Sequence, residues 1–370
     1  MAKISCAHFP SCTGCQFIGE EDSFQKETKL AQLSALIQTF DAQPNKLGWL
    51  SAGFSGLRDR LDFVWENGTF GLYSNSEKKV IGIDFCQQLS PRLNDWFQEF
   101  KKIQWPIKKG SIRLRVGPQG LKGAWLDFAN LDIKMLLLEK TALTTLLKTG
   151  AVVEIGQKRK ILKVEQDLLK LKDPESHLWF ESLFQNQRVA LFCHIASFTQ
   201  PSMKANYLIV QQIQNWVSQS GFLKASEFGA GIGNLSLALL GHVESLRIFE
   251  SDALSLECLQ QTLNQSPNLQ AQFEKIDFQI GDHQQRKKIE FESHEVLVVN
   301  PPRSGLMGFV ETLKDSSEKP SEFIYLSCSP ATWSTDGQKL KAMGYQLKET
   351  FIVDQFPQTQ HYEILSRWLF

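Results

Sequence analysis

Residues 224–235 read KASEFGAGIGNL, and this stretch decides how the second half of the chain folds. Its first residues suit a short strand, and three glycines at alternate positions follow. Glycine allows a tight turn and a close approach of a ligand to the backbone, and the N–H groups at the start of a following helix can face that ligand. The stretch therefore predicts a strand, a glycine loop and a helix with a binding site at the loop.

Strand and helix patterns alternate on both sides of this stretch. Residues 296–299 are a continuous apolar run, which is typical of a strand buried on both faces. Such alternation predicts a doubly wound, mostly parallel α/β domain, which binds ligands at the carboxyl ends of its strands. The strands are expected near 225–229, 246–250, 276–280, 295–299 and 323–327.

Polar residues at these strand ends indicate the ligand. Glu250 ends the second strand, where its carboxylate could accept both hydroxyls of a ribose, and Asp282 follows the third, where it could meet an adenine amino group. With Gly229 and Gly231 of the loop, this spacing fits a dinucleotide or S-adenosylmethionine. The fourth strand runs into residues 300–303, Asn-Pro-Pro-Arg, whose rigid prolines favour S-adenosylmethionine.

Two further segments carry reactive side chains. Cys328 follows the strand predicted near 323–327, at the same edge as the glycine loop, where a thiolate could act as a nucleophile. Glu363 ends the polar, turn-rich segment 354–363, just before a last strand, and its carboxylate could act as a general base.

Cysteines crowd the start of the chain. Cys6, Cys12 and Cys15 share one short loop, and Cys86 follows a strand predicted over 80–85. An odd total of seven cysteines argues against a disulfide framework. Three thiols on a loop plus one distant thiolate suit a [4Fe–4S] cluster or a structural zinc ion. The spacing leaves both open, and the histidine between the first two cysteines is a further candidate ligand for zinc.

The middle of the chain has a different pattern. Segments 61–65, 111–116 and 124–128 partly alternate apolar and polar residues, which predicts an antiparallel sheet within an α+β domain. Residues 101–172 hold 16 Lys/Arg against 6 Asp/Glu, so this domain could offer a positive surface to a polyanion. A solvated basic surface without a ligand explains the same count equally well.

Length and composition set the frame for these motifs. The 370 residues suggest two or three domains. We expect an N-terminal cysteine region with a linking helix over 1–92, a central α+β domain over 93–187 that is continuous with 45–92, and the α/β domain over 188–370. The chain is 42% apolar and 22% charged, which is ordinary for a globular protein. It contains no apolar run of the roughly 18 residues that a membrane span needs and no secretory signal, so we expect a cytoplasmic protein. Separately, we expect a monomer.

Together the motifs resemble those of the RNA uracil-5-methyltransferases, which form 5-methyluridine with S-adenosylmethionine. The resemblance covers nearly the whole chain, and its last motif is the most specific. The shared motifs are the cysteine cluster, Phe198-Thr199-Gln200, the glycine loop, Glu250, Asn300-Pro301-Pro302-Arg303, Ser327-Cys328-Ser329-Pro330 and Asp354-x-Phe356-Pro357-x-Thr359-x-His361-x-Glu363. Ser202 and Ser329 stand where the family usually has asparagine. The cysteine cluster at the N-terminus, with no preceding β-barrel domain, most resembles the short branch that acts on 23S ribosomal RNA.

The resemblance implies a Rossmann-like class I methyltransferase domain and a role for particular residues. Cys328 would be the nucleophile that adds to C6 of the uracil, and Glu363 the base that removes the C5 proton. The remaining assignments are Cys6, Cys12, Cys15 and Cys86 for a [4Fe–4S] cluster, and Gln200, Gly229, Gly231, Glu250, Asp282 and Asn300 for S-adenosylmethionine. The expected partner is RNA, with ribosomal RNA favoured and tRNA possible; DNA and membranes are not expected.

Two other interpretations fit part of the sequence. An amino methyltransferase acting on adenine or glutamine usually has an aromatic residue after the prolines, where Arg303 stands here, and it would give Cys328 and Glu363 no task. A non-catalytic iron–sulfur RNA-binding protein would explain the unusual Ser202 and Ser329, but not the presence of both reactive residues.

Overall fold

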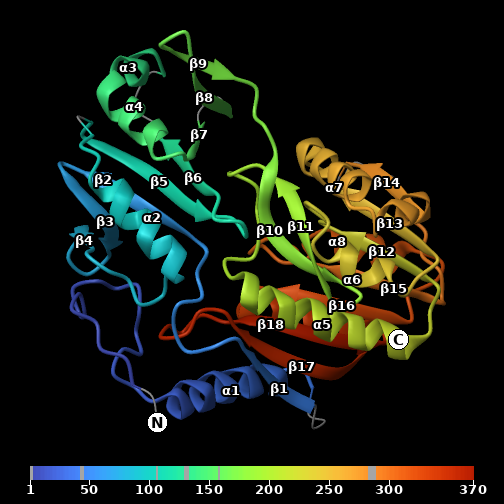
Figure 1. The fold of residues 1–370 in the computed structure, drawn as a ribbon. Helices are drawn as coiled ribbons and strands as arrows, with labels where there is room; N and C mark the ends of the chain where they lie inside the picture. The colour runs from blue at the N-terminus through green and yellow to red at the C-terminus, as the bar shows by residue number, and fades with distance from the viewer. Residues whose placement is uncertain (1–2, 42–45, 106, 129–132, 157–158, 282–288) are drawn as a thin grey trace.

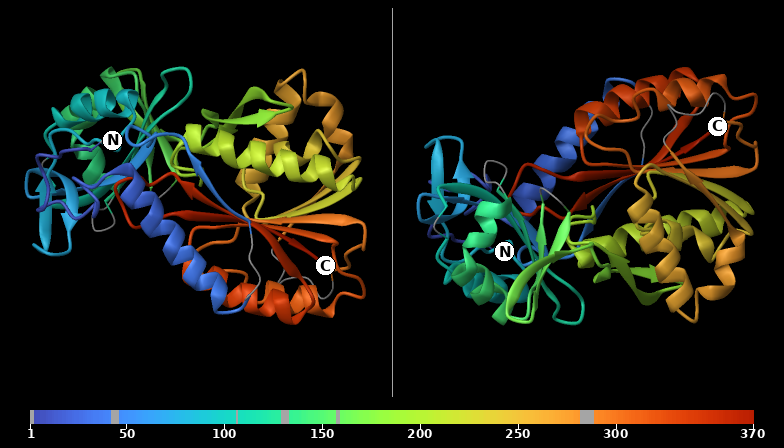
Figure 2. Two further views of the ribbon diagram at one scale, coloured as in Figure 1. Left: turned by 90° about the horizontal axis from the view of Figure 1, so that it is seen from below. Right: turned by 90° about the horizontal axis from the view of Figure 1, so that it is seen from above.

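The computed structural model describes residues 3–41, 46–105, 107–128, 133–156, 159–281 and 289–370. Two bodies lie side by side, each built around a large sheet, and a two-stranded hairpin lies between them (Figure 1). The two bodies can also be distinguished when the molecule is seen from below and from above (Figure 2). The predicted combination of an α/β domain and an α+β domain is therefore confirmed.

The central body is an eight-stranded sheet in the order β4-β3-β2-β5-β6-β7-β8-β9. Neighbouring strands from β4 to β6 are antiparallel, as the alternating pattern predicted, whereas β6 and β7 are parallel. Its elements are β2 (Arg60–Glu66), β3 (Thr69–Ser74), β4 (Lys79–Gly82), α2 (Pro91–Lys101), β5 (Lys109–Val116), β6 (Lys122–Asp127), α3 (Ile133–Leu138), α4 (Lys140–Lys148), β7 (Val152–Ile155), β8 (Lys160–Glu165) and β9 (Leu168–Lys172).

The second body has the sheet order β1-β17-β18-β16-β15-β12-β13-β14, in which β18 is antiparallel to both of its neighbours. The five predicted strands of the α/β domain are all present. Its elements are α1 (Asp22–Gln38), β1 (Lys46–Ser51), α5 (Met203–Ser220), β12 (Lys224–Phe228), α6 (Ser236–Leu240), β13 (Ser245–Glu250), α7 (Ala253–Gln265), the 3₁₀ helix η1 (Gln270–Lys275), β14 (Ile276–Ile280), β15 (Glu295–Val299), α8 (Phe309–Asp315), β16 (Glu322–Ser327), α9 (Pro330–Ala342), β17 (Gln346–Asp354) and β18 (Glu363–Leu369).

Helices cover both faces of this sheet (Figure 2). Strand β15 shows how one strand serves two cores: Val296 and Val298 pack with α5, α6 and α7, whereas Leu297 and Val299 pack with α1, α8 and α9. Successive side chains of a strand point to opposite faces, so a strand between two helical layers is apolar at every position. This explains the continuous apolar run in the sequence.

Segments from outside the C-terminal part complete this body, and α1, which packs with α8 and α9, is one of them. Strand β1 runs parallel to β17, with Lys46 opposite Glu349. The hairpin of β10 (His177–Phe184) and β11 (Gln187–Cys193) packs in the same core as α5. The hairpin thus spans both sides of the boundary expected at residues 187 and 188. The division into 1–92, 93–187 and 188–370 stays a prediction.

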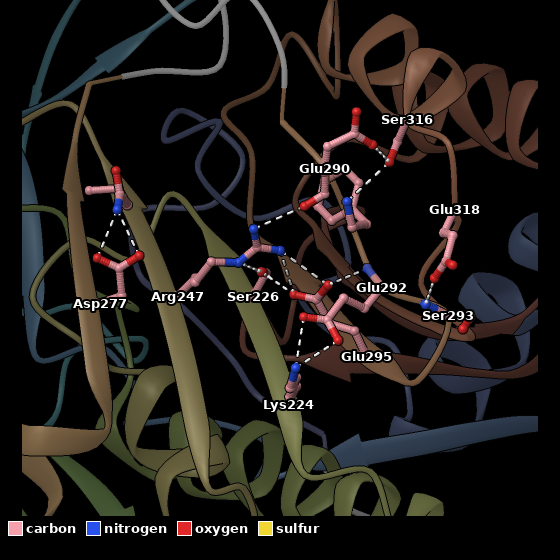
Figure 3. A network of polar contacts seen from close by, with 12 residues as sticks. Lys224, Ser226, Arg247, Asp277, Glu290, Glu292, Ser293, Glu295, Ser316 and Glu318 are labelled. Atoms are coloured by element: carbon pink, nitrogen blue, oxygen red, sulfur yellow. Dashed lines mark hydrogen bonds and ion pairs between the residues drawn. The ribbon is translucent and has the colours of Figure 1, made fainter.

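A polar network joins the amino ends of the central strands (Figure 3). Arg247 donates to Ser226 on one side, at 3.1 Å, and to the buried Glu295 on the other, at 3.0 Å. Lys224 pairs with Glu292 at 2.7 Å. Because ligands of such sheets bind at the carboxyl ends, this network lies at the opposite end and stabilises the register of β12, β13 and β15.

A buried ion pair fastens α1 to the end of β17. Lys29 Nζ lies 2.7 Å from Asp354 Oδ1, and both side chains are buried. We expect Lys29→Met to lower the free energy of unfolding by about 3–5 kcal/mol, because it leaves a buried carboxylate without its partner. Urea denaturation measures this loss. Lys46→Met is the matched control, since Lys46 is 70% exposed beside Glu349 and such pairs contribute little. Equal losses in the two variants would contradict a special role for the buried pair.

Candidate active site

The glycine loop after β12 is held by the end of β13. Gly231 has a φ of +55°, and its N–H donates to Glu250 Oε2 at 2.7 Å. Glu250 Oε1 accepts from the backbone of Asp252 at 2.8 Å. At Gly233, which has a φ of +83°, a Cβ atom would lie 2.3 Å from a methyl carbon of Leu259, so a larger residue would be strained and would force Leu259 to move. The acidic residue predicted from the sequence therefore also fixes the shape of the loop, which the sequence did not indicate.

A first cavity of about 290 Å³ opens at this edge. Its walls combine one carboxylate, the backbone of two loops and an apolar side, which suits a nucleoside whose ribose meets Glu250 and whose base meets carbon. The lining includes Phe228, Gly229, Phe249, Glu250, Gly281, Asn300, Pro301, Pro302, Leu306 and Phe309. The residues present thus fit the adenosyl part of S-adenosylmethionine.

The predicted cofactor residues are distributed unevenly around this cavity. Gly229, Glu250 and Asn300 line it; Gly231 does not, but its N–H donates to Glu250 Oε2. Gln200 is buried but does not line it; its Oε1 accepts from Gln355 Nε2 at 2.9 Å. The predicted site residue Asp282 lies outside the described residues.

A second, larger cavity of about 850 Å³ contains both predicted catalytic residues. Cys328 and Glu363 line it, and so do Asn300, Pro301 and Pro302, which also line the first cavity. The two cavities therefore share the Asn-Pro-Pro wall. A group bound in the first cavity can therefore react with a group bound in the second cavity beside these shared residues.

The Cys328 thiol is exposed to the second cavity and faces charges of both signs. Partial burial and the neighbouring Glu363 carboxylate raise the pKa of Cys328, while a hydrogen bond from Arg303 acts in the opposite direction. The thiolate is the nucleophilic form. Its fraction therefore rises with pH, and Arg303 stabilises it.

Glu363 is the first residue of β18 and is only 4% exposed. Burial raises the pKa of Glu363 to about 7, although a hydrogen bond with Gln355 and the charge of Arg60 lower it. Among the described residues, Glu363 Oε2 has no hydrogen-bond partner. A carboxyl group with a pKa near neutrality and a free oxygen can accept and release a proton.

Arginines of the central body form the far wall of this cavity. Arg58 and Arg60 precede or begin β2, and Arg113 lies in β5. Arg60 lies 5.3 Å from the ring centre of Phe198, which is 63% exposed. Arg58 and Arg60 lie outside the basic segment 101–172. The count of charges along the sequence did not indicate these arginines, because they come from separate strands and lie together only in the folded chain.

About half of the basic side chains in residues 101–172 are paired with acidic side chains. Lys109 meets Glu66, Lys122 meets Glu99 and Lys172 meets Glu165, each at 2.7–2.9 Å. Further pairs join Lys101 to Asp84, Arg113 to Asp62, Lys160 to Asp173, Lys163 to Glu175 and Lys170 to Glu165. The local excess of positive charge is therefore smaller on the surface than in the sequence.

The four predicted ligand cysteines line a third cavity of about 310 Å³. All four thiols are free, and burial together with the neighbouring Cys86 and Cys12 raises the pKa of Cys15 to about 12. Within the described part of the chain, no three His, Cys, Asp or Glu side chains are arranged as a metal site. The donor set suits a cluster, but the presence of one stays a prediction.

The sheet order and the first cavity define a class I S-adenosylmethionine-dependent methyltransferase. The profile of the tRNA (uracil-5-)-methyltransferase family matches residues 179–367. An uncharacterised RNA methyltransferase of Bdellovibrio bacteriovorus is 44% identical over 99% of this chain and 95% of that protein. The chain belongs to the (uracil-5-)-methyltransferase family.

Two other relatives show the range of the family. The 23S rRNA (uracil(1939)-C(5))-methyltransferase RlmD of Shewanella sp. (strain W3-18-1) is 26% identical, over 98% of this chain and 80% of that protein. The solved structure of a Pyrococcus abyssi tRNA (uracil-54, C5)-methyltransferase with S-adenosyl-L-homocysteine has a TM-score of 0.67 and 18% identity, over 97% of this chain and 86% of that one. At that identity it confirms the fold.

This membership identifies the chain as an enzyme that methylates C5 of uracil in RNA with S-adenosylmethionine. The non-catalytic alternative is not favoured. None of the helices in the described ranges is long and apolar enough to cross a membrane.

Proposed function

We propose that this enzyme methylates a uridine of 23S ribosomal RNA through a covalent bond between Cys328 and uracil C6. One observation carries the proposal: Cys328 and Glu363 face one cavity, whose Asn-Pro-Pro wall is shared with the cavity of the glycine loop. Relatives named as 23S rRNA (uracil-C(5))-methyltransferases match 98% of this chain. They support the choice of ribosomal RNA over tRNA.

The chemistry follows from the electronic structure of uracil. The Cys328 thiolate adds to C6, and the electrons of the C5–C6 double bond move to C5 and O4. S-adenosylmethionine supplies the methyl group that C5 then takes. Glu363 removes the C5 proton, the double bond forms again, and the C6–S bond breaks to release the thiolate. Covalent catalysis of this kind divides one difficult step into easier ones.

The arginines that line the second cavity can position the RNA. Neither C5 nor C6 of a stacked, paired uridine is accessible, so the nucleotide must leave the stack. Arg58 and Arg113 can bind its phosphate or carbonyl oxygens, and Phe198 offers an exposed ring on which a base can stack. This arrangement favours a loop or a locally opened RNA.

Methyl transfer to two RNA substrates tests the proposal. Labelled S-adenosylmethionine is supplied with unmodified 23S ribosomal RNA or with unmodified tRNA, and the nucleosides are analysed. We expect 5-methyluridine in the ribosomal RNA alone. Label in tRNA alone would overturn the substrate and keep the chemistry, whereas a methylated nucleoside other than 5-methyluridine would overturn the chemistry.

We further propose that Cys6, Cys12, Cys15 and Cys86 bind a [4Fe–4S] cluster. The support is that all four line one cavity, which has Thr13, Gly14 and Arg58 in common with the second cavity. A cluster held by these thiolates would connect the N-terminal loop to the end of β4 and thereby shape the wall that faces the RNA.

Iron content tests this assignment without reference to activity. We expect iron and acid-labile sulfide in protein purified without oxygen, and loss of most of the iron in Cys86→Ser, because three thiolates bind a cluster more weakly than four. Cys258→Ser is the matched control, since this buried thiol lies in α7, away from the cavity. Zinc without sulfide in the wild-type protein would show that the site holds a structural metal ion instead.

A further inference from the structure

The connector between β11 and α5, residues 194–202, has an irregular backbone that lies against the central sheet. Arginines of that sheet donate hydrogen bonds to its carbonyl oxygens. Arg60 Nη2 donates to Thr199 O at 2.7 Å, and Arg113 Nη1 donates to Ala196 O at 3.3 Å. The central body therefore holds a segment that belongs to the methyltransferase body.

Arg115 of β5 bonds to the connector at two places. Its Nη1 donates to His194 O at 3.2 Å and to Ile195 O at 3.3 Å. Its Nη2 donates to Thr199 Oγ1 at 3.0 Å. A guanidinium group carries several donors in a rigid fork, so one side chain can bind both places at once. These two places lie on either side of Phe198 in the chain.

Arg115 is closed to RNA, although it belongs to the basic segment 101–172. It is only 1% exposed, and its guanidinium carbon lies 5.8 Å from the ring centre of Trp179. It also lies directly opposite Arg60 in the register of β2 and β5. Like charges at such positions are destabilising, and a buried charge is costly unless its hydrogen bonds are satisfied. The oxygens of the connector offset this cost, so Arg115 and the connector stabilise each other.

The ring of Phe198 is open to the second cavity between these contacts. It is 63% exposed and lines that cavity, and Arg60 lies 5.3 Å from its centre. A binding group that is fixed before its ligand arrives loses less entropy on binding. The hydrogen bonds before and after Phe198 supply this constraint on an otherwise irregular segment.

We propose that Arg115 is a positioning residue that fixes the connector so that Phe198 presents its ring to an RNA base. The inference rests on the proposed function, since it assumes that RNA occupies the second cavity. Arg115 itself touches no RNA and acts through the backbone of the connector. A lysine cannot replace it, because one ammonium group lacks the fork that binds both places.

The test is the affinity of the full chain for unmodified 23S ribosomal RNA, measured by filter binding with S-adenosyl-L-homocysteine present. Should methyl transfer identify tRNA as the substrate, tRNA is the probe instead. Arg115→Met removes every donor of the side chain and keeps most of its length. We expect Kd to rise about 5- to 100-fold, the range for the loss of one base–aromatic stack. Arg115→Lys should give a rise of the same size.

Phe198→Ala supplies the measurement that a merely structural role of Arg115 would not affect. It should weaken RNA binding by a similar factor. The variant with both substitutions, Arg115→Met and Phe198→Ala, should bind at most about twofold more weakly than Phe198→Ala alone, because residues that act as one unit are not additive. If the two factors multiply instead, Arg115 acts independently of Phe198 and the proposal is overturned.

The salt dependence of Kd separates positioning from a direct phosphate contact. Loss of one phosphate contact lowers the slope of log K against log salt concentration by about one. We expect Arg115→Met to keep the wild-type slope. A slope that is lower by about one would show that Arg115 binds phosphate itself, and would also overturn the proposal.

Thr199→Val carries the test if Arg115→Met does not fold, since it removes only the hydroxyl that accepts from Arg115. It should weaken RNA binding about two- to tenfold, the size of one hydrogen bond, whereas Thr199→Ser should bind like the wild type. Equal affinities of these two variants would contradict the proposal. Arg247→Met is the matched control for the loss of an arginine. It breaks the contact with Glu295 at the other end of the methyltransferase sheet, so it should lower thermal stability and leave RNA affinity unchanged.

Failure of the proposed function is distinguishable from failure of the inference. If Phe198→Ala binds RNA like the wild type, the proposed role of this ring is wrong and the inference fails with it. If Phe198→Ala weakens binding but Arg115→Met and Thr199→Val, both shown to be folded by circular dichroism, keep the wild-type affinity, the inference alone fails.

Discussion

We expect Cys328→Ala to abolish methylation, with a loss of at least about 10³-fold in turnover, because the proposed mechanism has no other group that adds to uracil C6. The substitution removes a side chain exposed to the second cavity, so the fold and the first cavity stay intact. Binding of S-adenosyl-L-homocysteine should be unchanged. An RNA with 5-fluorouridine at the target should trap the wild-type protein covalently and leave the variant free.

Cys258→Ala is the control for this experiment, since it removes a buried thiol of α7 that lies in the core. It should form the trapped complex like the wild-type protein. Turnover by Cys328→Ala within about tenfold of the wild type would contradict the nucleophile assignment, since loss of a covalent nucleophile costs far more.

We expect Glu363→Gln to stall the reaction after methyl transfer and to accumulate the protein–RNA complex. We expect a loss of about 10²–10⁴-fold in multiple turnover, the usual contribution of a general base. A single round of methyl transfer should persist, because Cys328 and the first cavity are unchanged. Gel electrophoresis of the complex under denaturing conditions, together with the amount of label transferred per chain, measures both effects.

The turnover of the wild-type enzyme should depend on pH through the ionisation of Glu363. Burial raises the pKa of Glu363 to about 7, and only the ionised carboxylate can accept a proton. Turnover therefore falls more steeply as the pH drops through about 7, and this additional loss should be missing from the residual activity of Glu363→Gln, which keeps only the dependence on the Cys328 thiolate. Glu292→Gln is the control, because Glu292 pairs with Lys224 at the opposite end of the sheet. This variant should show the pH dependence of the wild-type enzyme. If Glu363→Gln turned over normally without accumulating the complex, Glu363 would be excluded as the base.

Short-range patterns were enough to predict the elements of the α/β body. Strands such as β12 and β13 begin and end within one or two residues of the expected positions, because the glycine loop and the apolar runs are local signals. No local pattern in the sequence predicted the position of β1 in the sheet. It pairs with β17, about 300 positions away, and such a pairing depends on surfaces that exist only once the chain is folded.

The class of the fold, the glycine loop and the candidate residues Cys328 and Glu363 could be predicted from the sequence, since each belongs to a motif with a local chemical meaning. The tertiary structure decided which groups surround them. The charge of Arg60 on β2 acts on Glu363 only in the folded chain, and burial there raises the pKa of Glu363. Electrostatic environment depends on distance in space and on exclusion of water, and neither quantity can be read from the order of residues.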